Sequence, residues 1–487
     1  MKAHIPKEAL QVAETLENAG FKAYFVGGCV RDLMLHAKPK DWDITTNASP
    51  EQIQGLFPET FYENTFGTVG VVTESTDPKL KVLEVTPFRT EGTYDNGRHP
   101  QSVSFVSNIE DDLHRRDFTI NALAYRSATD ELIDLFNGKE DITSKRLKAV
   151  GNPEQRFSED ALRILRGIRL SAELDFSLEL ETMTAISTCS HLLDKISKER
   201  IRDEFLKILN SGKPMPALFI AQKLGLLHYI IPELEEGIGC RQNQAHSFDV
   251  FEHLLRSLQH AADSNWSLEI RLAALLHDIG KPASRRWSEE KQDWTFYGHE
   301  VIGARMTKKI CVDLRLPKQQ SEIIERLVRW HMFFSDPDAI TLSAVRRVIT
   351  NIGKEYIWDL LNLRVCDRIG TGRPKAHPFR LRKYIAMVEQ ALRDPISVAQ
   401  LKIDGTILMK EVGIAAGPRL GWTLYALLEL VLENPELNTT KILMLKATEM
   451  QRLSDTELEL LGSSGKVTRD THEAEAIVKI KDKYHVN

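Results

Sequence analysis

The chain has 487 residues, of which 42% are hydrophobic and 27% are charged, and its formal net charge is −5. This composition is that of an ordinary globular protein, and the length predicts about three domains. No stretch of about 18 apolar residues is present, which excludes a typical membrane-spanning helix. Five scattered cysteines without a Cys-x-x-Cys spacing favour reduced thiols over disulfides or a zinc site. Because the first residues also lack the pattern of a signal peptide, we expect a cytoplasmic protein.

The N-terminal part alternates predicted helices and strands. The apolar spacing predicts a helix over 5–19, strands over 23–26 and 42–46, and a short helix between these strands. Further strands are predicted over 67–73, 81–88, 103–106, 131–135 and 146–150, with a polar loop over 90–101. Apart from the strands over 131–135 and 146–150, the sequence after residue 109 has mostly helical periodicity. The pattern therefore predicts an α+β fold, in which a mixed sheet with helices is followed by an all-α body.

Two glycines and two aspartates form the first candidate site. Gly27 and Gly28 follow the first strand and precede a helix, so backbone N–H groups can approach a phosphate without obstruction. Arg31 lies about one helical turn further on. Asp41 and Asp43 are two residues apart along a predicted strand, which places both carboxylates on the same side. A phosphate-binding turn beside carboxylates that can hold a divalent cation is what phosphoryl or nucleotidyl transfer requires.

The segment 114–125 combines a basic pair with apolar residues, and its pattern predicts a helix. On such a helix Asp117 and Asn121 share a face. Arg116 could stabilise a triphosphate, and either Asp117 or Asn121 could contact a ribose or a base. Taken alone, the segment is better explained as a surface helix with a solvated, charged end.

An acid and three arginines recur at intervals of three residues in the segment 159–170. Asp160, Arg163, Arg166 and Arg169 are predicted to form one stripe on a helix. An aspartate beside an arginine offers acceptors and planar donors that can imitate the Watson–Crick edge of a base. The alternative is a ladder of helical ion pairs, which would not need three arginines in line with one acid.

Four motifs in a fixed order carry a resemblance to a known family. They are Val-Gly-Gly-Cys-Val-Arg-Asp with Asp-Trp-Asp, Arg-Arg-Asp-Phe-Thr-Ile-Asn-Ala-Leu-Ala, Glu-Asp-Ala-Leu-Arg-Ile-Leu-Arg and Lys-Glu-Arg-Ile-Arg-Asp-Glu-Phe, within about residues 21–210. Together they resemble the class II tRNA nucleotidyltransferases, which are the CCA-adding enzymes and bacterial poly(A) polymerases of the polymerase-β superfamily. The resemblance implies addition of nucleotides from CTP and ATP to the tRNA 3′ acceptor end, without a nucleic-acid template.

The same resemblance implies roles for the matching residues. Asp41 and Asp43 would hold the Mg²⁺ ions that act on the RNA 3′-hydroxyl and on the departing pyrophosphate. Gly28 and Arg31 would contact the triphosphate of the nucleotide. Arg116 and Asn121 would help to seat its sugar and phosphates. Asp160 and Arg163 would select its base, with Arg166 and Arg169 in support.

A second candidate site begins with a His-Asp pair that follows the apolar run 272–276. Adjacent imidazole and carboxylate ligands at a helix end suit magnesium or a divalent transition metal. With further histidines and an aspartate, the pattern resembles the HD phosphohydrolase domain. This resemblance implies a divalent metal (Mg, Mn, Ni or Fe) and hydrolysis of a phosphomonoester or cyclic phosphate. The implied ligands are His253, His277, Asp278 and Asp367, with His299 and His331 for a second metal.

These observations predict five parts along the chain. They are a nucleotidyltransferase head over 1–145, a nucleotide-selecting neck with RNA-binding helices over 146–235, an HD domain over 240–370, a helical tRNA-binding body over 371–462 and a flexible tail over 463–487.

Three classes of function fit parts of this pattern. We favour a tRNA nucleotidyltransferase that carries an HD phosphohydrolase domain, with no membrane and no obligate protein partner. A pure hydrolase with a non-catalytic head is disfavoured by Asp41 and Asp43 together with Arg163. An RNA-binding protein with two decayed sites is disfavoured by the full His/Asp set. Within the favoured class, addition of the whole CCA, of A alone or of CC alone, and poly(A) synthesis stay open.

Overall fold

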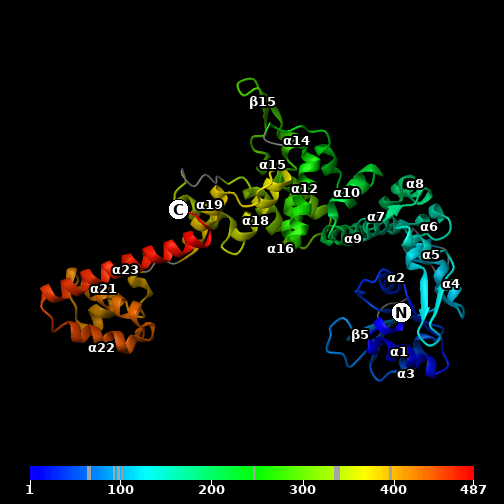
Figure 1. Cartoon of the computed structure of the whole chain (residues 1–487). Coiled ribbons are helices and arrows are strands. Elements are labelled where there is room, and N and C mark those ends of the chain that lie inside the picture. Colours follow the sequence, from blue (N-terminus) through cyan, green and yellow to red (C-terminus); the bar gives the residue numbers. More distant parts are fainter. Residues whose placement is uncertain are drawn as a thin grey trace. The chain divides into compact units, whose positions relative to one another are not determined.

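The computed structural model describes residues 1–62, 67–91, 94–95, 99–100, 103–244, 247–333, 340–393 and 397–486. The chain divides into two compact units, one of residues 1–331 with 362–374, and one of residues 332–361 with 375–487 (Figure 1). Part of the predicted HD segment 240–370 therefore packs with the second unit. Among the described residues, no helix is long and apolar enough to cross a membrane.

A seven-stranded mixed sheet forms the centre of the head, in the order β11-β10-β1-β2-β5-β4-β3. Neighbouring strands are antiparallel except for β2 and β5, which are parallel. The fully buried Phe25 and Ile44 are register partners in the middle of this sheet. Its strands are β1 (Ala23–Val26), β2 (Asp43–Thr46), β3 (Thr60–Tyr62), β4 (Val69–Val72), β5 (Val82–Pro87), β10 (Leu123–Arg126) and β11 (Glu131–Asp134).

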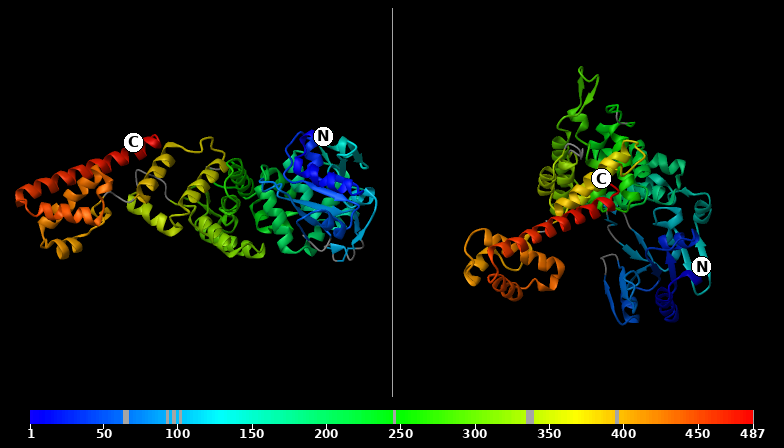
Figure 2. Two further views of the ribbon diagram at one scale, coloured as in Figure 1. Left: turned by 90° about the horizontal axis from the view of Figure 1, so that it is seen from below. Right: turned by 60° about the vertical axis from the view of Figure 1, so that its left-hand side comes forward.

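Short helices surround this sheet (Figure 2). Helix α3 begins at a capping box, in which Ser49 accepts a hydrogen bond from the backbone of Gln52. Helix α4 packs on the sheet face that carries Tyr24 and Val26. The helices of the head are α1 (Lys7–Asn18), α2 (Gly28–Met34), α3 (Pro50–Leu56), α4 (Ile109–His114) and α5 (Gly138–Thr143).

The predicted loop over 90–101 is more regular than expected where it is described. Strand β6 (Arg89–Glu91) pairs with β9 (Val103–Phe105), and β7 (Tyr94–Asp95) pairs with β8 (His99–Pro100). Residues 92–93, 96–98 and 101–102 lie outside the described residues.

The helix predicted over 114–125 is wrong. Helix α4 ends at His114, a 3-10 turn covers Thr119–Asn121, and β10 then enters the sheet. Leu123 and Tyr125 are fully buried between two neighbouring strands, so tertiary pairing decides the conformation of this apolar run. Asp117 and Asn121 still meet, because the side-chain amide of Asn121 donates to the Asp117 carboxylate at 3.3 Å.

Helices dominate the rest of the first unit, as predicted. After the head come α6 (Pro153–Glu159), α7 (Leu162–Leu174), α8 (Leu180–Thr188), α9 (Lys198–Asn210), α10 (Pro214–Lys223) and α11 (Leu227–Ile230), with β12 (Arg146–Leu147) beside β13 (Ser177–Leu178). The next group is α12 (Val250–Asp263), α13 (Leu268–Leu276), α14 (Lys281–Ser284), α15 (His299–Asp313) and α16 (Lys318–Trp330), with the hairpin of β14 (Arg286–Ser288) and β15 (Asp293–Thr295). Helix α18 (Ile357–Gly370) belongs to this unit from residue 362 on.

The second unit is helical, and its last helix replaces the flexible tail predicted over 463–487. Helix α23 (Asp455–Lys483) packs along α21 (Pro418–Glu433). A Cβ on Gly462 or Gly465 would overlap the backbone of Trp422 or Tyr425, so these glycines allow the two helices to approach closely. The Gly-Ser-Ser-Gly sequence is therefore a packing surface. The other helices are α17 (Leu342–Ile352), α19 (Phe379–Leu392), α20 (Gly405–Ile407) and α22 (Thr440–Met450).

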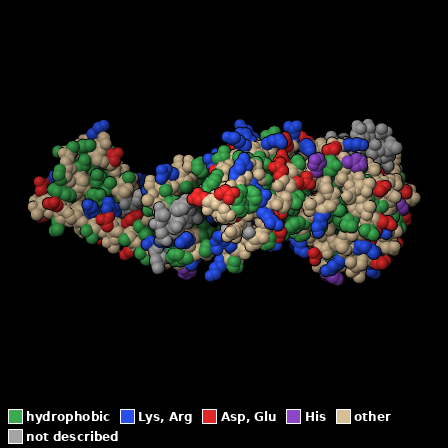
Figure 3. Space-filling model, turned by 90° about the horizontal axis from the view of Figure 1, so that it is seen from above, with side chains coloured by type: hydrophobic (Ala, Val, Ile, Leu, Met, Phe, Trp, Pro, Cys, Tyr) green, Lys and Arg blue, Asp and Glu red, His purple; other side chains and the backbone are tan. Residues whose placement is uncertain are grey.

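Acidic and basic side chains are interspersed over the face drawn in Figure 3, in keeping with the net charge of −5. Any basic surface for nucleic acid must therefore be local rather than global.

Candidate active site and candidate metal centre

Two cavities meet at the glycine turn and at Asp43. The smaller has a volume of about 420 Å³ and the larger one of about 1030 Å³. Gly27 has a φ of 74°, and a Cβ there would lie 3.0 Å from a guanidinium nitrogen of Arg116. The residue must therefore be glycine for both conformation and space. Four predicted residues line both cavities: Gly28, Asp43, Asn121 and Arg166.

The predicted carboxylate pair stands at the start of β2. Asp43 is its first residue, whereas the exposed Asp41 precedes the strand. Trp42 points the other way, since it is 7% exposed and packs edge-on against Phe25 at 5.8 Å. Burial and the negative charge of Asp41 raise the pKa of Asp43 to about 6, although Arg116 opposes this shift. A divalent cation would supply the positive charge that this carboxylate pair lacks, so these residues fit such an ion.

Asp160 does not lie on the same helix as the three arginines, which corrects the predicted stripe. Its backbone is extended (φ −143°, ψ 102°), so α6 ends at residue 159. One carboxylate oxygen accepts a hydrogen bond from the N–H of Leu162 at 3.1 Å, at the start of α7. The other accepts from Arg200 on α9 at 2.9 Å. The carboxylate is thus held in the smaller cavity from two sides.

Arg163 is not the ion-pair partner of Asp160. This side chain is 7% exposed, and it donates to Glu159 at 2.7 Å and to the carbonyl of Arg115 at 2.9 Å. It therefore joins α7 to the residues that precede the 3-10 turn, while still lining the smaller cavity.

A chain of polar contacts runs across the junction of the two cavities. Arg166 donates to Asp117 at 2.8 Å, Asn121 bonds the other oxygen of Asp117, and Arg31 donates to Asn121 at 2.7 Å. Burial opposes ionisation of Asp117, but the charge of Arg166 outweighs it and holds the pKa of Asp117 well below its usual range. The network thus remains ionised and fixes the side chains at the junction of the two cavities.

The remaining predicted residues line only the larger cavity. They are Arg31, Asp41 and Arg169. Arg169 is bound by Glu173 at 3.0 Å and by the buried Glu204 at 3.1 Å.

Three charged residues of the smaller cavity have no specific role in the prediction from the sequence. They are Arg89, Arg115 and Arg200. Arg115 and Arg200 lie within motifs that the sequence singles out, so their motifs were a signal. Arg89 lies outside these motifs, and its type and spacing do not distinguish it from other arginines.

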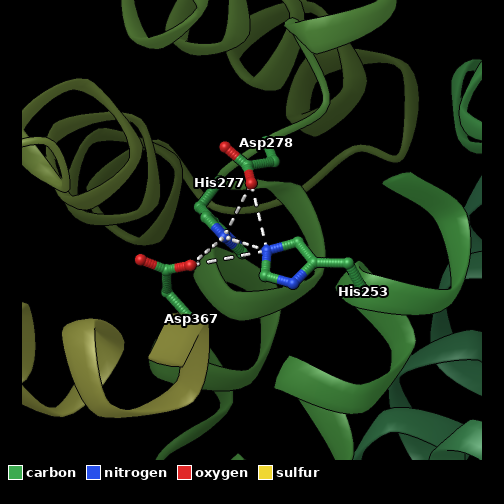
Figure 4. Close-up of side chains that lie close together, drawn as sticks. All are labelled: His253, His277, Asp278 and Asp367. Carbon is green, nitrogen blue, oxygen red and sulfur yellow. Dashed lines mark hydrogen bonds and ion pairs between the residues drawn. The ribbon is translucent and has the colours of Figure 1, made fainter. Parts of the chain in front are cut away.

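The second site gathers all six predicted residues of the HD pattern. His253, His277, Asp278 and Asp367 place one ligand atom each within 4.8 Å of one another, and Asp278 does the same with His299 and His331. They come from α12, the turn after α13, the start of α15, the end of α16 and α18. Figure 4 shows the first four side chains pointing toward a common centre. All six are buried, so a shared cation would offset the cost of enclosing the carboxylates.

Backbone carbonyls fix the orientation of three of the imidazoles. The Nδ1 atoms of His277, His299 and His331 lie 3.0, 2.7 and 2.7 Å from the carbonyl oxygens three residues earlier. With Nδ1 donating, each Nε2 presents a lone pair inward, which is the tautomer that a metal ligand requires. The Nε2 atoms of His253 and His277 are 3.0 Å apart. The donor set of imidazole nitrogens and carboxylates therefore fits a divalent metal.

The charged side chains around this centre shift one another's pKa values. Burial raises the pKa of Asp278, but Lys281 and His277 outweigh it and hold that pKa far below its usual value. Burial lowers the pKa of His277, but Asp278 and Asp367 reverse this effect and raise it to about 9. Lys281 donates to Asp278 at 2.6 Å and to Gln242 at 2.6 Å. Cations compensate the buried carboxylates, a role that a bound metal would share.

Models of three protein families match the chain. They are the Poly A polymerase head domain over residues 23–148, the probable RNA and SrmB-binding site of polymerase A over residues 175–238, and the HD domain over residues 250–357. The fold and the first cavity thus define a protein with a polymerase-type nucleotidyltransferase head and an HD domain.

Comparison with individual relatives shows the family within this class of proteins. The chain is 34% identical over 432 residues to a CCA-adding enzyme of Lactobacillus helveticus (strain DPC 4571), a match that covers 88% of this chain and 93% of the relative. A CCA-adding enzyme of Enterococcus faecalis (strain ATCC 700802 / V583) is 50% identical over 204 residues, which cover 42% of this chain and about half (49%) of that relative. The crystal structure of the Bacillus stearothermophilus CCA-adding enzyme in complex with CTP matches with a TM-score of 0.60 and 29% identity, covering 92% of this chain and 97% of that one. The chain belongs to the family of CCA-adding enzymes.

Proposed function

We propose that the protein adds the nucleotides CCA to the 3′ end of tRNA from CTP and ATP, without a nucleic-acid template. The observation that carries the proposal is that Asp43 and Asp160 line one cavity, although more than a hundred residues separate them in the sequence. A carboxylate that can hold a cation for the reacting phosphates thus shares a cavity with a carboxylate that suits the edge of a base. A solved relative of the same fold is a CCA-adding enzyme in complex with CTP, which supports nucleotide binding by this chain.

Each part of the nucleotide would meet a different group of residues. Gly27 is the N-cap of α2 and Gly28 is its first residue, so no side chain covers the first N–H groups of the helix, which stay open to phosphate oxygens. Arg116 would neutralise further phosphate charge, and Asp160 with Arg200 would offer an acceptor and donors to the edge of the base. Asp41 and Asp43 would hold magnesium, which when bound supplies charge against the reacting phosphates and lowers the pKa of the attacking hydroxyl. The chain's own contribution is to fix the nucleotide in position against these groups.

Limited additions, of A alone or of CC alone, and poly(A) synthesis are the alternatives to addition of the whole CCA. The test uses tRNA transcripts that end in the discriminator base, in C or in CC, each with CTP or ATP alone and with both. Extension of all three to the complete CCA end supports the proposal. Extension of only the CC-ended transcript would instead assign an A-adding enzyme, and an unlimited A tail would assign a poly(A) polymerase.

A second activity is favoured by the six buried residues of the HD site. We propose that they hold a divalent metal, whose bound form supplies Lewis-acid chemistry for hydrolysis of a phosphomonoester or cyclic phosphate. His253, His277, Asp278 and Asp367 would hold the first ion, and Asp278 would also face a second one held by His299 and His331. Metal content and hydrolysis of nucleoside 2′,3′-cyclic phosphate should be measured after loading with Mg, Mn, Ni or Fe. Binding and hydrolysis that are both lost in Asp367→Asn support the proposal, and hydrolysis that persists in this variant contradicts it.

The two proposed activities assign a function to each part predicted along the chain. We propose a head over 1–145, a neck over 146–235, an HD domain over 240–370 and a tRNA-binding body from 371, which now includes α23. We also propose that the protein works in the cytoplasm, because all five cysteines are buried free thiols, the form that a reducing compartment maintains.

A further inference from the structure

The β14–β15 hairpin has no role in the functions described so far, although it lies between two residues of the HD site. The chain passes from Asp278 through α14 into the hairpin, and from the hairpin to His299 at the start of α15. The hairpin protrudes from the surrounding helices at the label β15 (Figure 1). A ligand bound along its base is therefore held next to the HD site.

Contacts at the base of the hairpin fix its position relative to the HD site. Phe296 directly follows β15, and its carbonyl oxygen lies 2.7 Å from Nδ1 of His299. The centroid of the Phe296 ring lies 5.5 Å from Nζ of Lys281. Lys281 in turn donates to Asp278 at 2.6 Å. Phe296 is thus linked to both of the HD residues that flank the hairpin.

One face of the hairpin combines cations with aromatic rings. Trp287 and Trp294 are register partners, and their ring centroids are 5.3 Å apart. The guanidinium of Arg285 lies over the Trp294 ring, 3.6 Å from its centroid. Because side chains alternate along a strand, Phe296 follows Trp294 on the same face. A line of rings and cations therefore leads from Lys281 outward to Trp287.

Two groups on this face are available to a ligand. Trp287 is 45% exposed, and its aromatic neighbour is Trp294. Arg285 forms no ion pair with any residue in the described part of the chain, and its Nε is buried without a hydrogen-bond partner there. The guanidinium therefore stacks on an indole while its charge lacks an acidic partner. Such a group suits a phosphate.

The acidic residues of the hairpin lie away from this face. Asp293 precedes Trp294 in the strand, so it points to the opposite side. There a carboxylate oxygen of Asp293 accepts a hydrogen bond from the N–H of Gln244 at 3.1 Å. Glu289 and Glu290 lie in the turn between the two strands. The face itself therefore offers aromatic surface and positive charge.

Aromatic rings beside cations are typical of sites for single-stranded nucleic acid. A base of any identity can stack on an aromatic ring, and the cations bind the backbone phosphates. Three rings lie along the face, those of Phe296, Trp294 and Trp287. More rings are present than one nucleotide would cover, which favours a strand over a free mononucleotide.

We propose that this face of the β14–β15 hairpin binds a single-stranded RNA whose 3′-terminal phosphate lies at the HD site. A base of the strand would stack on Trp287, and Arg285 would bind one of its phosphates. This inference rests on the proposed hydrolase function of the HD site, because it assigns the recognition of the RNA strand for that site to the hairpin.

The test is binding of a short, fluorescently labelled oligocytidylate that ends in a 2′,3′-cyclic phosphate, measured by anisotropy on metal-free protein in EDTA. Trp287→Leu should weaken binding about tenfold, whereas Trp287→Tyr, which keeps a ring, should bind nearly as well as the wild type. Arg285→Gln should also bind more weakly, with a salt slope smaller by about 0.7. The control is Trp358→Leu, since Trp358 is a similarly exposed tryptophan (39%) on α18, and its affinity should equal that of the wild type.

Three results of the binding experiment would overturn the proposal. The first is equal affinity of Trp287→Leu and Trp358→Leu for the oligocytidylate. The second is a loss in Trp287→Tyr as large as that in Trp287→Leu, because it would exclude stacking as the cause. The third is binding of free cytidine 2′,3′-cyclic phosphate as tight as that of the oligocytidylate, because it would exclude a strand as the ligand.

Hydrolysis by manganese-loaded protein separates this inference from the hydrolase assignment. Trp287→Leu should raise the KM for the oligocytidylate about tenfold and leave kcat unchanged, and it should not affect hydrolysis of glycerol 1,2-cyclic phosphate, which has no base. If the wild type hydrolyses both esters and Trp287→Leu changes neither KM, the role of the hairpin is wrong. If the wild type hydrolyses neither ester but binds RNA through Trp287, the hydrolase assignment fails and the RNA site stands.

Discussion

Asp43 lies where the two cavities of the head meet, and its ionisation reports on the cation that we assign to it. Burial and Asp41 raise its pKa to about 6, above the usual 3.8. In metal-free protein the folded state therefore holds this proton more tightly than the unfolded state does. The free energy of unfolding should fall as the pH rises through the interval from about 4 to 6, by roughly 2–3 kcal/mol.

This pH dependence can be measured by thermal unfolding in EDTA at a series of pH values, for the wild type and for Asp43→Asn. The wild type should lose stability relative to the variant as the pH rises, and Mg²⁺ at pH 7 should restore it. The comparison also removes the contribution of metal at the HD site, because both proteins have that site. Parallel pH profiles for the two proteins would contradict the assignment.

Arg200 has a role that its motif alone does not reveal. From α9 it holds Asp160 at 2.9 Å, and its second terminal nitrogen is buried without a hydrogen-bond partner among the residues that the structure describes. Replacing it by methionine removes a charged hydrogen bond, so misincorporation of UTP and GTP relative to CTP and ATP should rise by about 10- to 100-fold. Nucleotide-competition assays measure this ratio. Arg202→Met, two residues further along α9, is the control and should keep the wild-type ratio; an Arg200→Met protein with that same ratio would refute the role.

At the scale of elements, α9 connects the nucleotide site to the HD site. It begins near Arg200, and its C-terminal end is capped by the buried Arg271 of α13, the helix that leads into His277. Arg271 donates to the carbonyls of Leu209 and Ser211 at 2.8 and 3.1 Å and to that of Trp266 at 3.0 Å. The Arg271 side chain therefore supplies the hydrogen-bond donor for three backbone carbonyls.

The capping role of Arg271 predicts a large loss of stability. Arg271→Met keeps the apolar stem but leaves buried carbonyls without a donor, which should cost about 3–5 kcal/mol. Thermal unfolding of the full chain measures this loss. Arg305→Met, at an exposed position of α15, should have no measurable effect, and equal melting temperatures for the two variants would contradict the capping role.

Local sequence pattern predicted most elements and failed where tertiary contacts decide. Helix α1, strand β1 and the short helix α2 follow from the apolar periodicity. The run 123–126 looks helical but is a strand, because two neighbouring strands enclose it. The glycines at 462 and 465 look flexible but allow two helices to pack closely. In both cases the conformation depends on elements outside the segment itself, which its own sequence does not reveal.

The same limit applies to the sites. The six HD residues were predicted because imidazole and carboxylate types in that order resemble a known pattern. The ion pair between Asp160 and Arg200 was not predicted, because the spacing of three residues favoured Arg163 as the partner. Arg200 lies forty residues after Asp160 in the sequence. The division of the transferase residues between two cavities also depends on the fold, because Gly28 and Asp43 border both.

At the scale of the whole molecule, the two sites use separate residues, so each should lose its activity alone. Asp41→Ala should abolish nucleotide addition and leave hydrolysis of nucleoside 2′,3′-cyclic phosphate intact. Asp278→Ala should do the reverse, because Asp278 faces all three of His253, His277 and His299. Parallel assays of both activities on both variants check this. Equal loss of nucleotide addition in the two variants would contradict the independence of the sites.

The most direct test of the transferase assignment is a crystal structure of the protein soaked with CTP or ATP in the presence of Mg²⁺. The account predicts a triphosphate beside Gly27 and Gly28, joined through a cation to Asp41 and Asp43, with the base against Asp160 and Arg200. A triphosphate bound away from Asp41 and Asp43 would contradict it.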